Sequence, residues 1–462
     1  MIRFFRVFLA ARSVVLFTSE FLLISTCFLL AGSILIEGFD LTLFLLYEQG
    51  LLRLAIVVLA IQLGLYFQDL YTQMRVRSRF ALIQKLCRVM GIAFLLQGLL
   101  AYLNRMLVLP SLMMIGGAAL SLCMLVVWRL IYSSVLWEGF GTERILFLGT
   151  NTAVEQIVRM ISERTDLGIS VVGYVDDNRP AGSLLEGFPV LGPARCLLQI
   201  VAQTKPQRIV IGVTDWREGL PVDALLELRL TGVGIESAGG LYEALCGRFC
   251  LSELRPSELI FSNVLSVRPG SLALQSIYTN LIGLAGLVLA APMMLLIAAA
   301  IKLSSCGPVM APQQRVGFNG IPFTLLRFRV SRADGTRTAV GRWLERWHLY
   351  ALPQLLNVVR GEMALVGPRP ERPEFAQVLS SVLPYYAQRH SVKPGMMGWS
   401  QIHGQYLDSV RDTMAGLEYD LYYIKNISIF LDIYIILRTL KAVFLSRDEA
   451  RPSLRNATAS AS

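Results

Sequence analysis

Long apolar runs dominate the first 130 residues of the chain. Four of them, at residues 14–36, 51–67, 89–109 and 111–128, are each about long enough to cross a hydrocarbon layer of ~30 Å. No small-residue cleavage site follows the first run, which argues against a removable secretion signal. The pattern therefore predicts an α-helical bundle of four transmembrane helices over residues 1–140.

The loops between these runs differ in charge. Basic residues precede the first run and separate the second from the third: Arg3, Arg6, Arg12, Arg75, Arg77, Arg79 and Lys85. The loop after the first run is acidic, with Glu37, Asp40 and Glu48. Because positively charged loops stay on the cytoplasmic side, both the N-terminus and the exit from the fourth helix are predicted to be cytoplasmic.

From residue 144 the pattern changes to short strand-like runs that alternate with helical spacing. The strand-like runs read RILFLG, ISVVGYVDD and RIVIGV, and TAVEQIVRMISER lies between the first two. This alternation predicts a Rossmann-like α/β domain over residues 141–265. The turn that starts at Gly149 keeps only the first glycine of GxGxxG, which argues against dinucleotide binding and favours a structural or regulatory module.

A further apolar run separates Arg268 from Lys302, with 33 uncharged residues interrupted by Pro292. The segment that follows is rich in arginine, as expected of a cytoplasmic flank. Since proline removes a helix hydrogen bond and kinks the chain, we expect a re-entrant membrane helix over residues 266–303, broken at Pro292. A plain fifth crossing is the alternative.

Composition agrees with a membrane protein and limits its partners. The 462 residues are 54% hydrophobic, and the net charge of +10 lies beside apolar spans. That arrangement favours anionic lipid headgroups and argues against nucleic acid. The seven cysteines show no disulfide framework, and no set of metal ligands stands out by spacing. A transporter is disfavoured because the four spans carry little interior charge beyond Glu20 and Arg105.

An ordered series of motifs follows the fifth run and extends to about residue 444. It reads Gly307-Pro308-Val309, Arg315-Val316-Gly317, Phe323 to Arg329, Leu352-Pro353-Gln354, Arg360-Gly361-Glu362-Met363, Gly367-Pro368-Arg369-Pro370, Lys393-Pro394-Gly395, Gly398-Trp399 and Tyr419-Asp420-Leu421-Tyr422-Tyr423. This series resembles the bacterial sugar transferases, also called polyprenyl glycosylphosphotransferases or phosphoglycosyl transferases. The whole layout resembles the branch associated with exopolysaccharide and exosortase systems.

The resemblance implies an α-rich cytoplasmic transferase domain over residues 304–447, followed by a disordered tail over residues 448–462. It implies a multi-pass protein of the bacterial inner membrane whose soluble domains are cytoplasmic. The implied reaction initiates exopolysaccharide synthesis by transfer of a sugar 1-phosphate from a nucleotide sugar, such as a UDP-hexose, to undecaprenyl phosphate. Mg²⁺ is expected if the protein is active, and a homo-oligomer or an active paralogue is a possible partner.

The catalytic dyad of that family is replaced in this chain. The family segment reads L-D-E-L-P-Q, whereas Tyr350 and Ala351 occupy the two acidic positions here. Alanine offers no ligand, and phenols are poor nucleophiles at neutral pH. Two interpretations stay open: a transferase with lost or impaired catalysis, or an inactive pseudoenzyme that acts as partner or regulator of an active transferase.

Candidate phosphate-binding residues surround the dyad positions. Arg360 and Arg369 lie in Gly/Pro-rich segments, where a fixed guanidinium can present forked donors to phosphate oxygens. The alternative is that these arginines snorkel at the membrane face. The resemblance adds four further substrate-site candidates: Arg327, Arg329, Glu362 and Asp420.

Overall fold

The computed structural model describes residues 2–4, 7–9, 11–35, 38–47, 49–71, 79–133, 142–164, 167–213, 220–254, 265, 267, 269–332, 335–403 and 410–445. The chain divides into two compact units, one made mainly of Leu9–Glu143 and the other mainly of Arg144–Ser462. Each unit is described by itself.

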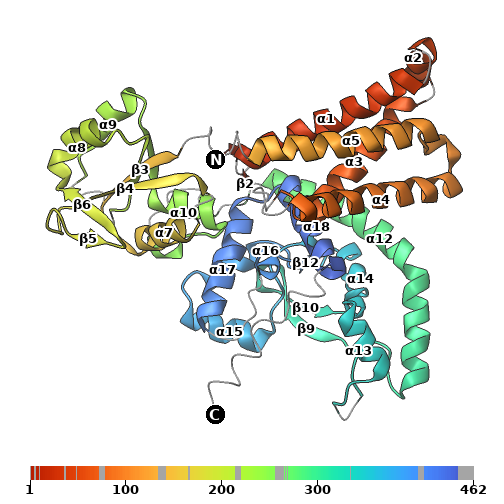
Figure 1. Ribbon diagram of the computed structural model, residues 1–462. Helices are drawn as coiled ribbons and strands as arrows, with labels where there is room; N and C mark the ends of the chain where they lie inside the picture. Colours follow the sequence, from red (N-terminus) through yellow and green to blue (C-terminus); the bar gives the residue numbers. More distant parts are fainter. Residues whose placement is uncertain are drawn as a thin grey trace, which may run out of the picture. The chain divides into compact units, whose positions relative to one another are not determined.

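The first unit is helical, as the apolar runs predict (Figure 1). Its helices are α1 (Ala11–Leu35), α2 (Gly38–Tyr47), α3 (Gly50–Phe67), α4 (Arg79–Leu103) and α5 (Ser111–Ile131). Two short strands, β1 (Ile2–Phe4) and β2 (Val7–Leu9), precede these helices in the chain and belong mostly to the second unit. Four of these helices are long and apolar enough to cross a membrane, and the short α2 was not predicted. Glycines allow close packing: a Cβ on Gly117 would lie 2.4 Å from the ring of Phe28, and one on Gly64 would lie 2.7 Å from Val89.

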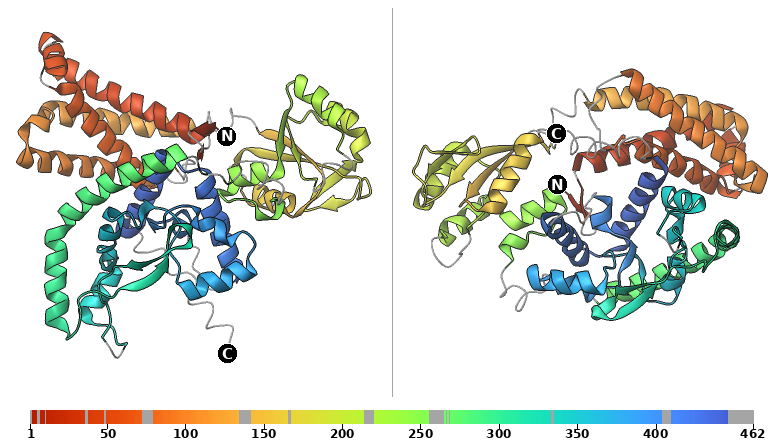
Figure 2. Two further views of the ribbon diagram at one scale, coloured as in Figure 1. Left: turned by 180° about the vertical axis from the view of Figure 1, so that it is seen from behind. Right: turned by 90° about the horizontal axis from the view of Figure 1, so that it is seen from below.

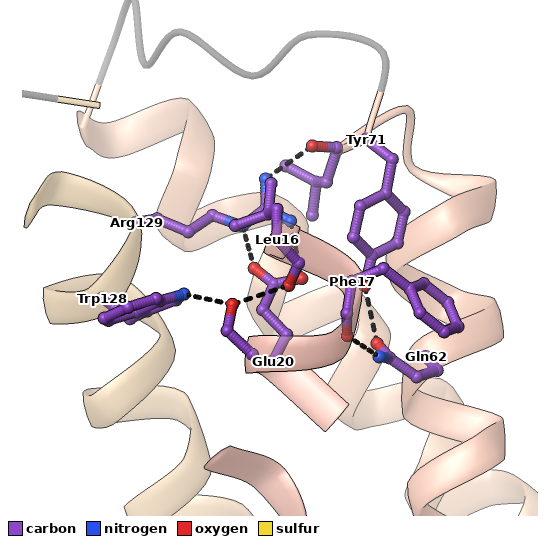
Figure 3. A network of polar contacts seen from close by, with 9 residues as sticks. Leu16, Phe17, Glu20, Gln62, Tyr71, Trp128 and Arg129 are labelled. Carbon is purple, nitrogen blue, oxygen red and sulfur yellow. Dashed lines mark hydrogen bonds and ion pairs between the residues drawn. The ribbon is translucent and has the colours of Figure 1, made fainter. Parts of the chain in front are cut away.

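A polar network joins the helices inside this unit (Figure 3). Arg129 of α5 donates two hydrogen bonds to the carboxylate of Glu20 in α1, at 2.7 and 3.0 Å, and both side chains are almost fully buried. Tyr71 donates to Gln62, which in turn donates to the carbonyl of Phe17. Because a buried charge is costly without its partner, this pair fixes how α1 and α5 align. The sequence reading placed Glu20 but missed Arg129.

A six-stranded sheet forms the first part of the second unit. Its strands are β3 (Glu143–Leu148), β4 (Ile169–Val175), β5 (Leu184–Leu185), β6 (Phe188–Gly192), β7 (Arg208–Ile211) and β8 (Gly234–Ser237), in the order β5-β6-β4-β3-β7-β8. The pairs β3–β7, β4–β6 and β7–β8 are parallel, and β5–β6 is antiparallel. The predicted α/β sheet is therefore confirmed, while its closer assignment as Rossmann-like stays a prediction.

Alternation along β3 explains why helices cover both faces of this sheet (Figure 2). Ile145 and Phe147 pack in one core with α7 (Thr152–Glu163) and α10 (Ala238–Cys246). Leu146 and Leu148 pack in another core with α8 (Leu197–Thr204) and α9 (Val222–Leu230). A strand buried on both faces reads as the continuous apolar run ILFL that the sequence shows.

The fifth apolar run forms one helix, α12 (Pro269–Ser304), which is also long and apolar enough to cross a membrane. Pro292 lies inside it, and both ribbon views show a marked bend in α12 (Figures 1 and 2). Proline removes one backbone hydrogen bond and bends a helix without ending it, which agrees with a continuous assignment through this residue. The structure thus has one continuous helix with Pro292 inside it where a break was expected.

The C-terminal part of the second unit combines short strands with helices. They are β9 (Gln313–Val316), β10 (Pro322–Leu325), α13 (Ala339–Arg346), α14 (Gln354–Val359), β11 (Ala364–Val366), α15 (Pro373–Val382), β12 (Gly395–Met397), α16 (Trp399–Ile402), α17 (Val410–Lys425) and α18 (Ile429–Leu445). β9 and β10 pair antiparallel, and β11 and β12 pair parallel.

This C-terminal part and the α/β sheet domain share a packed boundary. Phe249 and Leu251 lie in the same apolar core as Trp399 and Tyr422. The Trp399 indole donates to the carbonyl of Gly247 at 2.7 Å. Lys425 donates to both carboxylate oxygens of Glu243, at 2.8 and 2.9 Å. The two parts therefore contact through both apolar and charged groups.

Candidate functional site

The dyad positions lie in a short 3-10 turn, Leu349–Ala351, next to α12. Tyr350 packs against a small core that contains Ile297 and Ile301 of α12. Its carbonyl accepts a 2.9 Å hydrogen bond from the backbone of Phe328. A hydrogen bond thus holds the backbone at the dyad positions, but the two side chains there are a phenol and a methyl group.

Four arginines lie near one another, and Arg327 among them lies close to Tyr350. We call them the arginine cluster: Arg315, Arg327, Arg369 and Arg372. Burial is the main reason that the pKa of Arg315 falls below its usual value; the Glu371 carboxylate opposes the shift, and the charges of the other three arginines add to it. Burial also lowers the pKa of Arg327, with a further contribution from Arg372, while the nearby Tyr350 opposes the shift. A buried guanidinium with a lowered pKa lacks enough negative charge around it.

Few acceptors serve the arginine cluster. Arg315 donates to the carbonyl of Pro370 and to the side-chain oxygen of Gln313, and it lies 4.0 Å from the buried carboxylate of Glu371. The buried Nε atoms of Arg315 and Arg327 have no hydrogen-bond partner in the described part of the chain. Buried donors are normally paired, so these two unpaired atoms leave the arginine cluster short of acceptors. The geometry therefore suits phosphate, which arginine binds through several parallel donors.

Close backbone packing and a buried ion pair hold the Gly367–Pro370 loop, which carries Arg369. Gly367 and Gly395 approach so closely that a Cβ on Gly395 would lie 2.1 Å from the Gly367 nitrogen. Arg389 donates to the carbonyl of Arg369 at 3.1 Å and to Asp420 at 2.8 Å. Burial opposes the charge on Arg389, but the Asp420 carboxylate raises the pKa of its guanidinium above the usual range. This buried pair positions the loop.

The other predicted site residues are placed differently. Arg329 donates to the carbonyls of Cys306 and Ser305, so it ties down the end of α12. Glu362 accepts a 2.6 Å hydrogen bond from Asn357. Asp420 is buried against Arg389, and Arg360 is exposed at the end of α14. Of the predicted phosphate ligands, the structure brings together Arg327 and Arg369 only.

Sequence reasoning missed three arginines of this region as site residues. Arg315 was visible in the Arg-Val-Gly motif, and Arg372 follows the Gly367–Pro370 loop by two residues. A count of arginines near Gly/Pro-rich turns would have signalled both. Arg389 carried no such signal, since its role depends on a carboxylate that lies 31 residues further along the chain.

The residues at this site do not fit a magnesium ion. Mg²⁺ prefers carboxylate and other oxygen ligands, and neither dyad position supplies one. Within the described residues, no group of three or more His, Cys, Asp or Glu side chains could hold a metal ion. The four neighbouring arginines would further oppose a cation.

The turn after β3 is filled by the protein itself. Asn151 caps α7 by accepting from the backbone of Val154, and it donates to Glu253 at 2.8 Å. Thr150 donates to Asp176 at the end of β4. Asn151 thus takes up one of the backbone N–H groups at the start of α7, where a dinucleotide pyrophosphate binds in dinucleotide-binding folds.

Two family models match the chain. The model described as bacterial sugar transferase matches residues 271–446, which includes α12, the dyad positions and the arginine cluster. The model described as CoA-binding domain matches residues 66–227. The first match covers the whole series of motifs from residue 307 to residue 423.

Several curated proteins are similar to the chain. An undecaprenyl-phosphate glucose phosphotransferase of Komagataeibacter xylinus is 42% identical over 177 residues, 34% of this chain and 33% of that protein. A UDP-glucose:undecaprenyl-phosphate glucose-1-phosphate transferase of Xanthomonas campestris pv. campestris is 28% identical over 330 residues, 65% of this chain and 66% of that protein. The exopolysaccharide production protein ExoY of Sinorhizobium fredii is 31% identical over 211 residues, 39% of this chain and 90% of that protein. The matched part thus spans about a third to two thirds of the first two relatives.

Proposed function

Because the chain belongs to the bacterial sugar transferase family, we propose that it binds the phosphate-bearing substrates of that family at the membrane but has lost their turnover. The substrates are a nucleotide sugar such as a UDP-hexose and undecaprenyl phosphate, which the names of its relatives specify. In this role the protein is a partner or regulator of an active transferase.

One observation carries the proposal: the arginine cluster persists beside dyad positions that hold no carboxylate. Arg315 and Arg327 keep buried Nε donors without a protein acceptor, and Arg369 is exposed on a loop held by Arg389. An incoming phosphate would supply the missing acceptors. Transfer needs a nucleophile that bonds to the sugar-bearing phosphorus while the bond to the nucleotide breaks, and neither Tyr350 nor Ala351 supplies a carboxylate for it.

A transferase with impaired turnover is the second candidate. The ordered backbone around Tyr350 favours it, because the 2.9 Å bond from Phe328 holds this position beside Arg327. In that case the phenol itself would have to take the phosphoryl group. The two candidates differ in whether any lipid-linked sugar forms.

The proposal includes a location and a topology. We assign the protein to the bacterial inner membrane, with α12 entering and leaving on the cytoplasmic side. We also propose that the chain has five parts, at residues 1–140, 141–265, 266–303, 304–447 and 448–462. The bend in α12 supports re-entry, and protease access to a C-terminal tag in sealed vesicles tests it. An external C-terminus would refute this topology.

The function is tested with full-length protein in lipid nanodiscs that contain undecaprenyl phosphate. Labelled UDP-glucose and Mg²⁺ are added, and both bound nucleotide sugar and lipid-linked product are measured against an intact relative as positive control. We expect binding without product. Arg315→Met should weaken binding about tenfold or more, because it removes a charge-assisted contact. Arg342→Met, an exposed arginine on α13, is the matched control.

Two further variants separate the candidates. Product from the wild type that disappears in Tyr350→Phe would overturn the loss of turnover and make the phenol the nucleophile. The double variant Tyr350→Asp with Ala351→Glu supplies both missing carboxylates. Product from the double variant alone would show that the arginine cluster still positions the substrate.

A further inference from the structure

One face of α17 lies at the boundary with the α/β sheet domain. Glu418 accepts a 3.4 Å hydrogen bond from the Tyr242 hydroxyl, and Lys425 donates to both carboxylate oxygens of Glu243. Tyr242 and Glu243 are neighbours on α10 of the α/β sheet domain. The two ends of this stretch of α17 are therefore both held against one helix of the other domain.

The opposite face of α17 carries Asp420. At about 100° per residue, Glu418 and Lys425 lie about 20° apart around the helix axis, and Asp420 lies about 140–160° from both. Asp420 is 2% exposed, and its two carboxylate oxygens have different donors. Oδ2 accepts from Arg389 at 2.8 Å, and Oδ1 accepts from the Ser400 hydroxyl at 2.9 Å. One helix thus contacts the α/β sheet domain on one side and Arg389 on the other.

The short helix α16 makes a second connection between the same two places. Its first residue, Trp399, donates to the carbonyl of Gly247 in the α/β sheet domain at 2.7 Å. The same indole stacks on Tyr422 of α17, with 5.8 Å between the ring centres. The next residue, Ser400, is the donor to Asp420. A displacement of Trp399 therefore also displaces the hydroxyl that orients the Asp420 carboxylate.

Arg389 connects Asp420 to the arginine cluster. It donates to the carbonyl of Arg369 at 3.1 Å, within the Gly367–Pro370 loop. A buried ion pair is costly to break, so Arg389 and Asp420 are expected to move together. Binding groups must be held within about 0.5 Å of their productive positions, and neighbouring residues do this. A small displacement of α17 therefore changes how the Arg369 side chain is presented to a phosphate.

We propose that docking of the α/β sheet domain on α16 and α17 sets the affinity of the arginine cluster for its anion, with Ser400 and Asp420 as positioning residues. This inference rests on the proposed function, because it needs an anion at the cluster. The coupling is reciprocal by linkage, so a bound anion also tightens the boundary. The α/β sheet domain is then a regulatory module, and a ligand that releases it from α17 weakens anion binding.

Hydrogen exchange of the full-length protein in lipid nanodiscs measures the loop without any ligand. Lys425→Met removes a boundary contact, and Ser400→Ala removes a donor to Asp420. We expect peptides that cover residues 364–372 to exchange about fivefold faster in each variant, the effect of losing one hydrogen bond. The matched controls are Lys205→Met, at an exposed lysine that follows α8, and Ser381→Ala, at an exposed serine that bonds within α15.

UDP-glucose binding to the same samples measures the affinity. Lys425→Met and Ser400→Ala should each bind about fivefold more weakly than the wild type, and the controls should bind equally. The double variant Glu243→Lys with Lys425→Glu reverses the ion pair and should regain most of the affinity that Lys425→Met loses. A purely local role of Lys425 would not allow this rescue from the other domain.

The reciprocal effect is measured at the boundary itself. Bound UDP-glucose should slow exchange of wild-type peptides that cover residues 241–254 by about the same fivefold, as linkage requires. Ser400→Ala should show a smaller change on addition of UDP-glucose, because it removes one of the connections between the boundary and the loop.

Unchanged exchange at residues 364–372 in both variants would overturn the positioning role. An equal increase in every peptide would also overturn it, because that result reports general loosening of the fold. Faster loop exchange with unchanged UDP-glucose affinity would overturn the coupling to the anion. A wild type that binds no UDP-glucose instead refutes the proposed function, and loop exchange without ligand still decides whether Ser400 and Lys425 position the loop.

Discussion

Removal of Arg389 should release the Gly367–Pro370 loop. Arg389 donates to Asp420 at 2.8 Å, to the Tyr386 hydroxyl at 2.6 Å and to the Arg369 carbonyl at 3.1 Å, all in a buried environment. Arg389→Met keeps most of the side-chain length but leaves the Asp420 carboxylate buried without a cation. The loop then loses both its tether and the charge balance behind it.

The expected cost follows from the buried pair. Removal of one partner from a buried ion pair typically costs about 3–5 kcal/mol, whereas replacement of both partners by apolar groups is often close to neutral. At about 1.4 kcal/mol per factor of ten, a loss of this size corresponds to roughly 10²-fold to several 10³-fold easier local opening. The effect should be largest where the loop pairs with the segment around β12, because Gly367 and Gly395 both donate to that contact.

Hydrogen exchange read by mass spectrometry measures this opening directly. Peptides that cover residues 364–372 and 392–398 should exchange faster by that factor in Arg389→Met, and UDP-glucose binding should weaken with them. Arg342→Met serves as the control for loss of a positive charge. The double variant Arg389→Met with Asp420→Leu should recover much of the protection. If the loss of protection in the double variant equals the sum of the losses in Arg389→Met and in Asp420→Leu, the two residues are not coupled and the argument is refuted.

Three further predictions concern other parts of the second unit. Burial raises the pKa of Glu418 from the ordinary 4.5 to about 7. The contribution of this carboxyl group to stability is therefore full below pH 4.5 and is lost as the pH rises through 7. Glu418→Gln should flatten the fall in melting temperature between about pH 5 and about pH 8, and an unchanged slope would contradict the argument. Gly395→Ala places a Cβ 2.1 Å from the Gly367 nitrogen and should destabilise the protein by about 2 kcal/mol or more, whereas Gly416→Ala, with nothing within 4 Å, should not, as thermal melts would show. Trp399→Leu removes an indole that donates a 2.7 Å bond to the α/β sheet domain, so limited proteolysis should cut between the two parts faster than in wild type, and equal rates would count against that contact as a tether.

The sequence predicted the features that depend on local periodicity. The run ILFL in β3 and the long apolar runs appear as expected, because each element's pattern reflects the faces that it buries. The break expected at Pro292 did not appear, because α12 continues through this proline. Local chemistry was sufficient for these features.

Pairings between distant residues could not be predicted. Glu20 and Arg129 are separated by 109 positions, and Arg389 and Asp420 by 31, so no spacing along the chain connects either pair. The substrate role predicted for Asp420 illustrates the consequence. Its family motif marked it as a candidate ligand, yet its carboxylate is buried against Arg389. Through Arg389 it supports the Gly367–Pro370 loop.

The free-energy cost of the arginine cluster bears on why it is there. Four guanidinium groups repel one another, and burial lowers the pKa of Arg315 and Arg327. Glu371 lies 4.0 Å from Arg315 and balances only part of that charge. A purely structural cluster would carry more acceptors, since unpaired buried donors destabilise the fold. An anion bound there would remove the repulsion and supply the acceptors, and this is the physical argument for our proposal that the cluster binds phosphate.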